Sequence, residues 1–503
     1  MPPTTLTKSD FTAGAQCEKR LYLQKHHPEL AALPSDTLDR RAEDGIVVGK
    51  LGRRYYPGGI LIDAANGEPL EQTAYAIRSG VDTIFEATFL SEDVGAYVKC
   101  DILKRIPGSI DQWHVIEAKS GTKPDADYVN DVAFQVYAAR AAGLNVVRAS
   151  LLLVNNQYVF GDGDLDLSAF FTEIDVTDRV EAVLPTIQAE VRRFQTMLDV
   201  ADTPNIETNR HCDSTPKCEF HGHCHADQPE HDVIQLPRIL AKQVTEFREA
   251  GCRTIPDIPD EMLAKKPQWM MIRDVIQTSH PHFGPGLREA LSAVTYPLHF
   301  IDFESVGSAI PLYAGTRPYQ PLCFQWSNHI IDTPGAELRH EEFLHTTSGD
   351  PRPAFAETLW RSVKDAGTIV IYSGFEISRL KNLADDGIPY GAELSEKLTG
   401  CVLDILKVVK EHTYHPAYKG SFSVKKVLPA LVPELSYADL AIHDGDTASV
   451  RYLEMQGFRP SDQAPEEIAA NLLEYCSLDT LAMVKIFEVL AEKAGLAETQ
   501  MLQ

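Results

Sequence analysis

The sequence predicts a two-domain α/β protein. Its 503 residues are more than one ordinary hydrophobic core organises, so two domains are expected. In both halves, short apolar stretches typical of strands alternate with longer stretches whose apolar residues recur at helical spacing, which favours α/β architecture. We place the domains at residues 1–228 and 293–503. Residues 229–292, which contain several prolines between short helical pieces, are expected to form a helical connector.

The composition is that of an ordinary soluble globular protein with a strong excess of acidic residues. Hydrophobic residues make up 44% and charged residues 24%, and the formal net charge is -25. This charge argues against a protein that coats nucleic acid through bulk electrostatic attraction, although carboxylates that bind metal add to the same excess. No stretch approaches the roughly 20 apolar residues of a membrane helix, and no signal peptide is recognised. We therefore expect a cytoplasmic enzyme with no membrane partner.

The elements of the N-terminal domain follow from its apolar spacing. A first helix, which carries Cys17 and Tyr22, is predicted over residues 15–31. Strands are predicted at 83–90, 96–105, 112–119 and 146–154, and helices at 125–142 and 178–199.

Three residues of this domain form the first candidate site. Asp101 lies on one predicted strand, and Glu117 and Lys119 lie at the end of the next. Side chains two apart on a strand share a face, so Glu117 and Lys119 are expected to point the same way, with Asp101 beside them. Two carboxylates can hold Mg²⁺ or Mn²⁺, and the lysine can orient water or bind phosphoryl oxygens. An exposed ion pair at a strand end is the alternative.

The pattern D-(x15)-E-x-K resembles the core of the PD-(D/E)XK nucleases, specifically their RecB-like branch. The resemblance implies a restriction-endonuclease-like domain with metal ligands at Asp101 and Glu117 and a catalytic lysine at Lys119. Gln135, on the following helix, matches the glutamine of that branch's motif and is taken as a further catalytic residue.

The sequence departs from that branch at two places. The tyrosine that usually follows four residues after the glutamine is replaced by Ala139, and Tyr137 lies two residues earlier than that position. The metal-binding histidine that often ends an early Gly-x-x-x-His segment is replaced by Gly49. Glu86 is a candidate substitute for that ligand.

Four cysteines form the second candidate site. Cys212, Cys218 and Cys224 recur every six residues after the nuclease-like core, and Cys17 precedes it. Four thiolates can bind Zn²⁺ or a [4Fe–4S] cluster, and the spacing does not match a C-x2-C zinc knuckle. The arrangement resembles the iron–sulfur staple of RecB-like nucleases, including CRISPR-associated and AddB-type enzymes, which implies a structural [4Fe–4S] cluster. The alternatives are free thiols, or zinc with histidines competing as ligands (His211, His221, His223 and His225).

The third candidate site lies in the C-terminal domain. Asp302 and Glu304 stand two apart in an apolar strand, and Tyr475 and Asp479 stand four apart on the last helix. Unpaired buried charge is costly, so two acids on a buried strand indicate bound cations. Residues four apart share a helix face. Together these carboxylates can hold two metals for in-line attack on a phosphodiester, and the tyrosine can position water.

These motifs resemble the DEDD exonucleases, the DnaQ-like proofreading type of RNase H-like fold, in their tyrosine variant. Asp302 and Glu304 match the first motif, and Tyr475 and Asp479 match the third. The second motif usually ends in Phe/Tyr-Asp; here Phe375-Glu376 places the longer Glu376 at that position. Asp404 is similar to an acidic position that follows the second motif, and is taken as a further metal ligand.

The order of motifs along the whole chain resembles an uncharacterised bacterial two-domain nuclease family. The segment GSFSVKKVLPAL contributes Lys425 and Lys426, which are candidate nucleic-acid contacts. A solvated helix start is the alternative for both.

We expect a metal-dependent nuclease, with DNA favoured as substrate and exonuclease action as the mode. Repair or phage defence is the expected setting, with a helicase or defence-system subunit as partner. The alternative is a partly degenerate nucleic-acid-binding subunit of a larger complex. If only one half cuts, the C-terminal half is expected to do so, because it keeps a carboxylate at every motif position.

Overall fold

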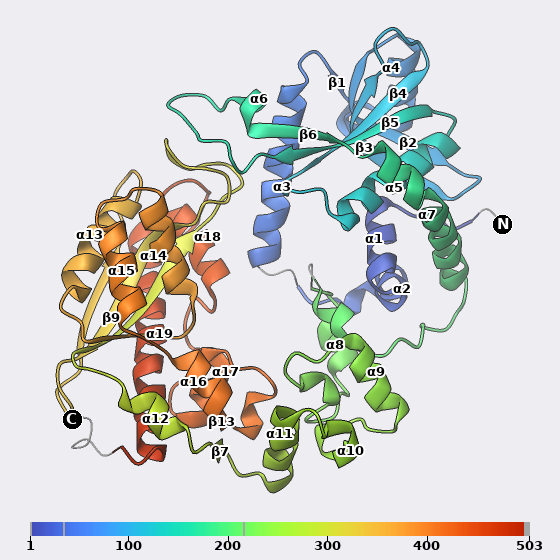
Figure 1. Cartoon of the computed structure of the whole chain (residues 1–503). Coiled ribbons are helices and arrows are strands. Elements are labelled where there is room, and N and C mark those ends of the chain that lie inside the picture. Colours follow the sequence, from blue (N-terminus) through green and yellow to red (C-terminus); the bar gives the residue numbers. More distant parts are fainter. Residues whose placement is uncertain (1–2, 34–35, 215–216, 497–503) are drawn as a thin grey trace. The chain divides into compact units, whose positions relative to one another are not determined.

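The chain is an α/β protein with two compact units, seen in a computed structural model that describes residues 3–33, 36–214 and 217–496 (Figure 1). The first unit comprises residues 1–227 and 308–320, and the second comprises 228–307 and 321–503. The predicted α/β class is confirmed.

A six-stranded mixed sheet forms the centre of the first unit, in the order β1-β2-β3-β4-β5-β6. The strands β2, β3 and β4 are antiparallel neighbours, and β5 runs parallel to β4. The strands are β1 (Ile60–Leu61), β2 (Thr83–Ser91), β3 (Ala96–Arg105), β4 (Gln112–Lys119), β5 (Asn145–Val154) and β6 (Phe171–Asp175). Strands therefore form at all four predicted positions of this domain.

Helices cover both faces of this sheet because its strands bury alternate side chains on opposite sides. Ile84 packs into the core beneath α5 and α7, whereas its neighbour Phe85 packs into a second core with α3 and α6. The helices are α1 (Lys8–Gln16), α2 (Glu18–His26), α3 (Asp36–Tyr55), α4 (Pro69–Arg78), α5 (Ala126–Ala141), α6 (Leu167–Phe170), α7 (Thr177–Leu198) and α8 (His221–His225).

The first predicted helix, over 15–31, is wrong in its extent. The chain forms two helices there, α1 and α2, which meet at Cys17. Cys17 has an extended backbone (φ -165°, ψ 120°) and therefore interrupts the helical hydrogen bonding. Thr7 and Asp10 form a capping box at the start of α1, and this box fixes where the helix begins.

A five-stranded mixed sheet forms the centre of the second unit, in the order β10-β9-β8-β11-β12. The strands β8, β9 and β10 form an antiparallel meander, and β11 and β12 extend it in parallel with β8. The strands are β8 (Leu298–Val306), β9 (Leu322–Ile331), β10 (Arg339–Leu344), β11 (Thr368–Ile371) and β12 (Val402–Asp404). A small separate pair consists of β7 (His282–Phe283) and β13 (Thr413–Tyr414).

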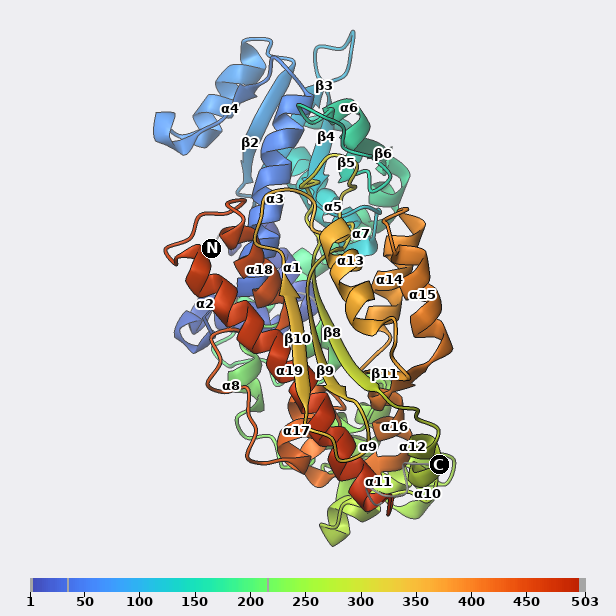
Figure 2. The ribbon, with the colours of Figure 1, turned by 90° about the vertical axis from the view of Figure 1, so that its left-hand side faces the viewer.

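The helices of this unit lie on both sides of its sheet. The long helix α19 runs along one side with α18, and α13, α14 and α15 cover the other (Figure 2). The helices are α9 (Ala241–Glu249), α10 (Asp260–Leu263), α11 (Pro267–Thr278), α12 (Leu287–Ser292), α13 (Arg352–Val363), α14 (Phe375–Asp385), α15 (Gly391–Gly400), α16 (Ile405–His412), α17 (Val424–Leu431), α18 (Gly445–Met455) and α19 (Pro465–Lys493).

Two segments fall into different units from those expected. Residues 229–292, predicted as a separate connector, belong to the second unit, and residues 308–320, within the predicted C-terminal domain, belong to the first. The latter segment connects β8 to β9. Its Ala309 lies in the core beside α3, and Thr316 accepts a hydrogen bond of 2.9 Å from the backbone of Phe160.

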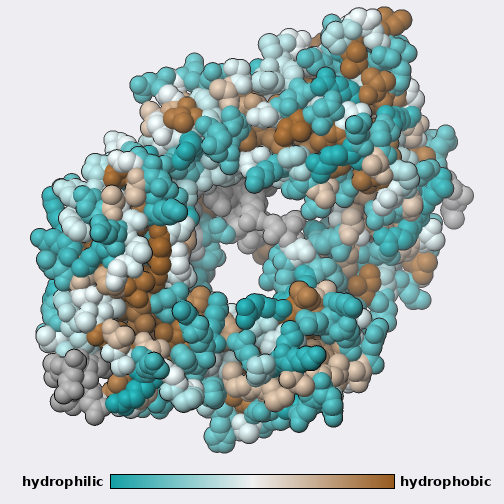
Figure 3. All heavy atoms as spheres, viewed as in Figure 1, coloured by the Kyte–Doolittle hydropathy of each residue, from teal (hydrophilic) through white to brown (hydrophobic). Residues whose placement is uncertain are grey.

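Hydrophilic residues cover most of the face shown in Figure 3, where hydrophobic residues form small separate groups. None of the described helices is both long and apolar enough to span a membrane.

Candidate functional site

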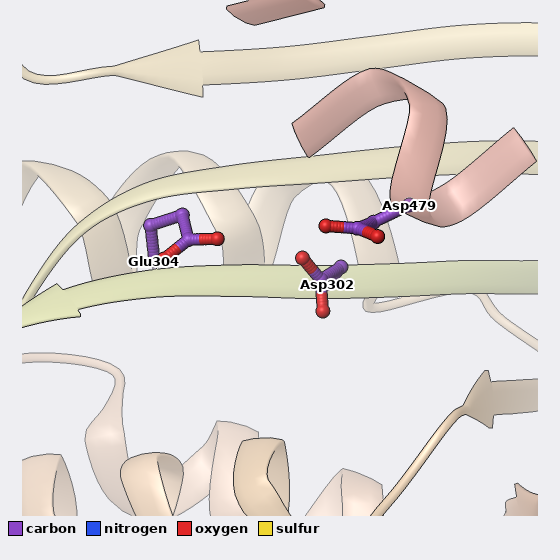
Figure 4. Close-up of side chains that lie close together, drawn as sticks. All are labelled: Asp302, Glu304 and Asp479. Atoms are coloured by element: carbon purple, nitrogen blue, oxygen red, sulfur yellow. The ribbon is translucent and has the colours of Figure 1, made fainter. Parts of the chain in front are cut away.

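Three carboxylates of the second unit converge on one point. Ligand oxygens of Asp302, Glu304 and Asp479 all lie within 4.8 Å of one another, and no other group of three His, Cys, Asp or Glu does so in the described part of the chain. In Figure 4, Asp302 and Glu304 project from β8, and the carboxylate of Asp479 reaches them from α19. Oxygens bound to one Mg²⁺ at about 2.1 Å lie about 3–4 Å apart, so small side-chain movements bring these donors into coordination.

The local sequence explains why these acids meet. Along β8, Ile301 and Phe303 pack into the core beneath α13, so the alternating residues Asp302 and Glu304 face α19 instead. Phe300 shares that second face, where its ring lies 5.6 Å from the ring of Phe487 on α19. One face of the strand is thus an ordinary apolar core, and the other carries the acids.

Burial makes this cluster electrostatically costly without a cation. Glu304 is 7% exposed and Asp479 is 8% exposed. Burial, and then the charge of Asp479, raise the pKa values of Asp302 and Glu304 well above their ordinary range, and burial also raises the pKa of Asp479. A bound cation relieves this repulsion, so the donor set fits a divalent metal ion.

Glu376 is a fourth acid beside this group. It lies in the first turn of α14, is 2% exposed, and forms a hydrogen bond with Asp302. Burial raises its pKa to about 8. Its Oε2 atom is buried without a hydrogen-bond partner. Such an atom is available to a ligand or water, so Glu376 can supply a further oxygen donor beside Asp302.

The structure places Asp404 differently from the expectation that it binds metal. It lies outside the three-carboxylate group and caps α16, where its Oδ1 accepts a hydrogen bond of 3.0 Å from the backbone of Lys407. It acts on Glu376 only through its charge.

Replacement of Asp404 distinguishes a capping role from a metal-binding role. Asn caps helices about as well as Asp, so Asp404→Asn is expected to keep cleavage within about threefold of wild type. Asp404→Ala is expected to lower the free energy of unfolding by about 1 kcal/mol through loss of the cap, with little effect on Mn²⁺ affinity. Thermal melts and Mn²⁺ titrations of both variants test this. A loss of Mn²⁺ affinity in Asp404→Asn would restore the predicted ligand role.

Lys425 and two tyrosines border the carboxylates. The Lys425 Nζ atom lies 3.4 Å from the hydroxyl of Tyr475, and 5.3 Å and 5.7 Å from the ring centres of Tyr475 and Tyr437. Tyr437 donates a hydrogen bond of 2.6 Å to Asp479 Oδ1, and Tyr475 also hydrogen-bonds Asp479. Lys425 and Tyr475 line a cavity of 290 Å³ with the carboxylates, whereas Lys426 is exposed and does not line it.

The first unit brings its own predicted residues together. Asp101 on β3 and Glu117 on β4 lie on neighbouring antiparallel strands, and Asp101 Oδ2 accepts a hydrogen bond of 3.0 Å from the backbone of Ala118. Lys119 lies 3.1 Å from Glu117 Oε1 and also pairs with Asp131 on α5. Burial raises the pKa of Asp101 well above its ordinary range.

Every oxygen of Glu117 is already engaged. Its Oε1 atom also lies 2.5 Å from the ammonium group of Lys8, and Gln135 donates a hydrogen bond of 2.5 Å to its Oε2 atom. Burial disfavours the charged carboxylate, but Lys8 and Lys119 outweigh it and lower the pKa of Glu117 to about 2. As arranged, these residues do not fit a divalent cation as the second unit does, because two ammonium groups occupy the side of Glu117 that such a cation needs.

The structure also shows where the residues that depart from the RecB-like motifs lie. Tyr137 packs partly buried in the hydrophobic core instead of at the site. Glu86 lies in β2 opposite Asp101, with φ +57°, and pairs at 2.9 Å with Arg53. Arg53 follows Gly49 by one turn of α3. Glu86 is therefore balanced by an arginine near the position where the histidine was expected.

The four cysteines line one pocket. Cys17 joins α1 to α2, while Cys212, Cys218 and Cys224 come from the loop and short helix before residue 227. Side chains of α1 and α2 hold that loop: Gln16 donates 3.0 Å to the carbonyl of His211, and Arg20 pairs at 2.9 Å with Glu219. These contacts explain how residues about 200 positions apart in sequence reach one pocket.

The four thiols are less closely grouped than the three carboxylates of the second unit. No three of these sulfur atoms lie within 4.8 Å of one another, whereas four thiolates on tetrahedral zinc lie about 3.8 Å apart. Two of the competing histidines are engaged elsewhere, since His221 pairs with Asp213 at 3.3 Å and stacks on His225 at 3.8 Å. Burial raises the pKa of Cys218 to about 11, so its thiol is protonated at neutral pH. Because a metal binds the thiolate, this proton must leave when metal binds.

Two residues of these sites were not predicted from the sequence. Lys8 is 109 residues from Glu117, and Tyr437 is 42 residues from Asp479 in a loop without periodicity. The capping box of Thr7 and Asp10 was a readable sign of a helix start next to Lys8. No local pattern around Tyr437 indicates its contact.

Comparisons with known proteins give two similarities. Residues 299–423 match a family described as a domain of unknown function (DUF2779). This stretch contains β8 and Glu376, and ends before Tyr475 and Asp479. The protein named Uncharacterized protein UU173, from Ureaplasma parvum serovar 3, is 25% identical over 210 residues, which are 37% of this chain and 30% of that protein. The chain thus spans about a third of that relative, and neither name states an activity.

Proposed function

We propose that the chain is a metal-dependent nuclease and that cleavage takes place at Asp302, Glu304 and Asp479. The convergence of these three oxygen donors within 4.8 Å is the observation that carries the proposal. Hard oxygen donors of this kind are the ligands that Mg²⁺ and Mn²⁺ take in phosphodiester-cleaving sites.

The residues around the carboxylates have complementary roles in this proposal. A divalent cation, when bound, supplies an activated water and stabilises charge developing on the phosphate. Asp302, Glu304 and Asp479 hold the cation, and Glu376 adds a carboxylate on the side of Asp302. Tyr475 orients the attacking water, and Lys425, beside its hydroxyl, offsets the negative charge of the phosphate.

The sheet arrangements support the finer fold assignments. The order β10-β9-β8-β11-β12, with three antiparallel strands extended by two parallel ones, agrees with an RNase H-like domain. In the first unit, acids on adjacent strands with the lysine two residues on, followed by the Gln135 helix, agree with a PD-(D/E)XK domain of the RecB-like type. DNA is the favoured substrate, and repair or phage defence with a helicase or defence-system partner is the favoured setting.

A second function is favoured for the first unit by the contacts of Glu117. Because Lys8 and Gln135 occupy that carboxylate, this unit is a candidate nucleic-acid-binding module that supports cleavage at the other site. The four cysteines are proposed to hold a [4Fe–4S] cluster, because all four line one pocket and no three of their sulfur atoms lie within 4.8 Å of one another. Its role is structural, because hydrolysis needs no electron transfer.

Separate inactivation of the two sites tests the proposal. Wild type, Asp302→Asn, Asp101→Asn and the double variant are assayed with Mg²⁺ or Mn²⁺ on end-labelled single-stranded and double-stranded DNA and RNA. The proposal expects Asp302→Asn to remove most cleavage and Asp101→Asn to change substrate affinity more than rate. Unchanged cleavage in Asp302→Asn would reject the assignment of the site.

The raised pKa of Glu376 predicts how stability depends on pH and metal. The folded chain keeps the Glu376 proton up to about pH 8, while the unfolded chain loses it near 4.5. Between these values the folded state binds more protons, so the free energy of unfolding of the metal-free protein falls as pH rises. The melting temperature in EDTA is therefore expected to decrease as the pH rises from about 5 to about 8, and to decrease less in Glu376→Gln.

Mn²⁺ is expected to restore the stability that the metal-free protein loses as the pH rises. At about 100 times its dissociation constant, bound Mn²⁺ adds about 2.7 kcal/mol to the free energy of unfolding, which raises the melting temperature of a unit of this size by roughly 5–10 °C. The increase should be larger at pH 8 than at pH 6, because protons compete for the same carboxylates. Thermal melts in EDTA and in Mn²⁺ measure both effects, and a Mn²⁺ increase that grows as pH falls would contradict the account.

A further inference from the structure

Neighbouring elements hold the backbone around Lys8 in place. Leu6, two residues earlier, bridges to the start of β3 through backbone hydrogen bonds of 2.9 Å with Gly95 and Tyr97. The capping box then orients the first turn of α1, and its Asp10 is held at 2.8 Å by Lys25. Lys8 is therefore part of an ordered helix start, with its side chain 27% exposed.

The ammonium group of Lys8 lies where a cation would bind Glu117. Its Nζ atom is 2.5 Å from Oε1, closer than the 3.1 Å of Lys119. The other oxygen, Oε2, accepts from Gln135, whose own Oε1 atom is buried without a hydrogen-bond partner. This buried acceptor is therefore available to a ligand or water at the site.

We propose that Lys8 is a resident cation of the first unit's site, which occupies Glu117 in place of a divalent metal ion and must leave before one can bind. The inference rests on the proposed nucleic-acid-binding role of the first unit, and on the cation-ligand role of Asp101 and Glu117 that the resemblance to RecB-like nucleases implies. An ammonium group at 2.5 Å satisfies the charge of a buried carboxylate, and a metal ion at the same oxygen would meet strong repulsion from two lysines. A phosphate of bound nucleic acid offers Lys8 another partner, so metal and nucleic acid are expected to bind there cooperatively.

Mn²⁺ binding to variants of Lys8 tests this directly. The Asp302→Asn chain is used as background, because it removes the strong site of the second unit and leaves Mn²⁺ to report on the first. Lys8→Gln removes the charge but keeps a hydrogen-bond donor for Glu117, and Lys8→Arg keeps the charge. Calorimetry or Mn²⁺ electron paramagnetic resonance measures affinity with and without a short non-cleavable single-stranded oligonucleotide.

Lys8→Gln is expected to bind Mn²⁺ at least about tenfold more tightly than the background chain, and Lys8→Arg is expected to bind it as weakly. The oligonucleotide should increase Mn²⁺ affinity in the background chain and much less in Lys8→Gln. Adding Asp101→Asn to Lys8→Gln should remove the gained affinity.

Equal or weaker Mn²⁺ binding in Lys8→Gln overturns the proposal, and so does the absence of Mn²⁺ binding in every variant. Circular dichroism and thermal melts verify folding, and Lys8→Met provides a second uncharged side chain if Lys8→Gln unfolds. Cleavage by chains with an intact Asp302 is measured separately. A failure of the proposed nuclease activity is thus distinguishable from a failure of the Lys8 proposal.

Discussion

Asp302→Asn is expected to reduce Mn²⁺-dependent cleavage by at least about 10³-fold, a loss of about 4 kcal/mol of transition-state stabilisation. Asp302 lies at the centre of the site: its carboxylate meets those of Glu304 and Asp479, and it hydrogen-bonds Glu376. Asn offers one weaker oxygen donor and no charge, so the cation loses its central ligand. Single-turnover cleavage of an end-labelled oligonucleotide at saturating Mn²⁺ measures the effect.

The same substitution is expected to stabilise the metal-free fold. Removing one charge relieves repulsion among buried acids, so the melting temperature of Asp302→Asn in EDTA should equal or exceed that of wild type, while its increase with Mn²⁺ disappears. Asp332→Asn is the matched control, since Asp332 follows β9 at the surface and pairs with Arg339. It should cleave like wild type. A 10³-fold loss accompanied by unfolding would assign Asp302 a structural role instead.

Cys224→Ser is expected to abolish the [4Fe–4S] cluster and to destabilise the first unit. Protein purified without air should lose its broad absorbance at about 400 nm and its stoichiometric iron and sulfide. The cluster ties Cys17 to the segment around Cys212–Cys224, so its loss should lower the free energy of unfolding. A decrease of about 2–3 kcal/mol would lower the melting temperature by roughly 5–10 °C. Since α1 (Lys8–Gln16) spans about 13 Å between Lys8 and its C-cap Cys17, loss of the cluster should also disturb the Lys8–Glu117 pair.

Cys401→Ser controls for the loss of a thiol as such. Cys401 lies in the second unit, and its thiol donates to the carbonyl of Lys397 at 3.1 Å, a bond that serine can replace. This variant should keep its colour and its melting temperature. Colourless wild-type protein with one equivalent of zinc would contradict the cluster assignment.

The parts of the fold that could be predicted are those with strong local patterns. Short apolar stretches separated by turns predicted β2, β3 and β4, and an i to i+4 pair placed Tyr475 and Asp479 on one helix face. The strands β9 and β10 were not predicted. Nearly all residues of β9 are buried. Its sequence therefore lacks the alternation of apolar and polar residues that marks a strand with one solvent-exposed face. β10 is mostly exposed and polar, and shows no apolar stretch.

The candidate sites divide in the same way. Residues within one strand or helix were predicted together, such as Asp302 with Glu304, because local geometry fixes their relation. Lys8 and Tyr437 reach their carboxylates through tertiary packing, which no local spacing encodes. Asp404 was assigned to metal by motif similarity, and no local pattern indicated that it also caps the start of α16.

Anomalous diffraction from crystals soaked with Mn²⁺ and a short single-stranded oligonucleotide tests the central claim most directly. The account predicts an anomalous peak within about 2.2 Å of oxygens from Asp302, Glu304 and Asp479, with a phosphate of the oligonucleotide beside it and near Lys425. Mn²⁺ bound elsewhere while these three carboxylates remain protonated and without metal would contradict the proposed active site.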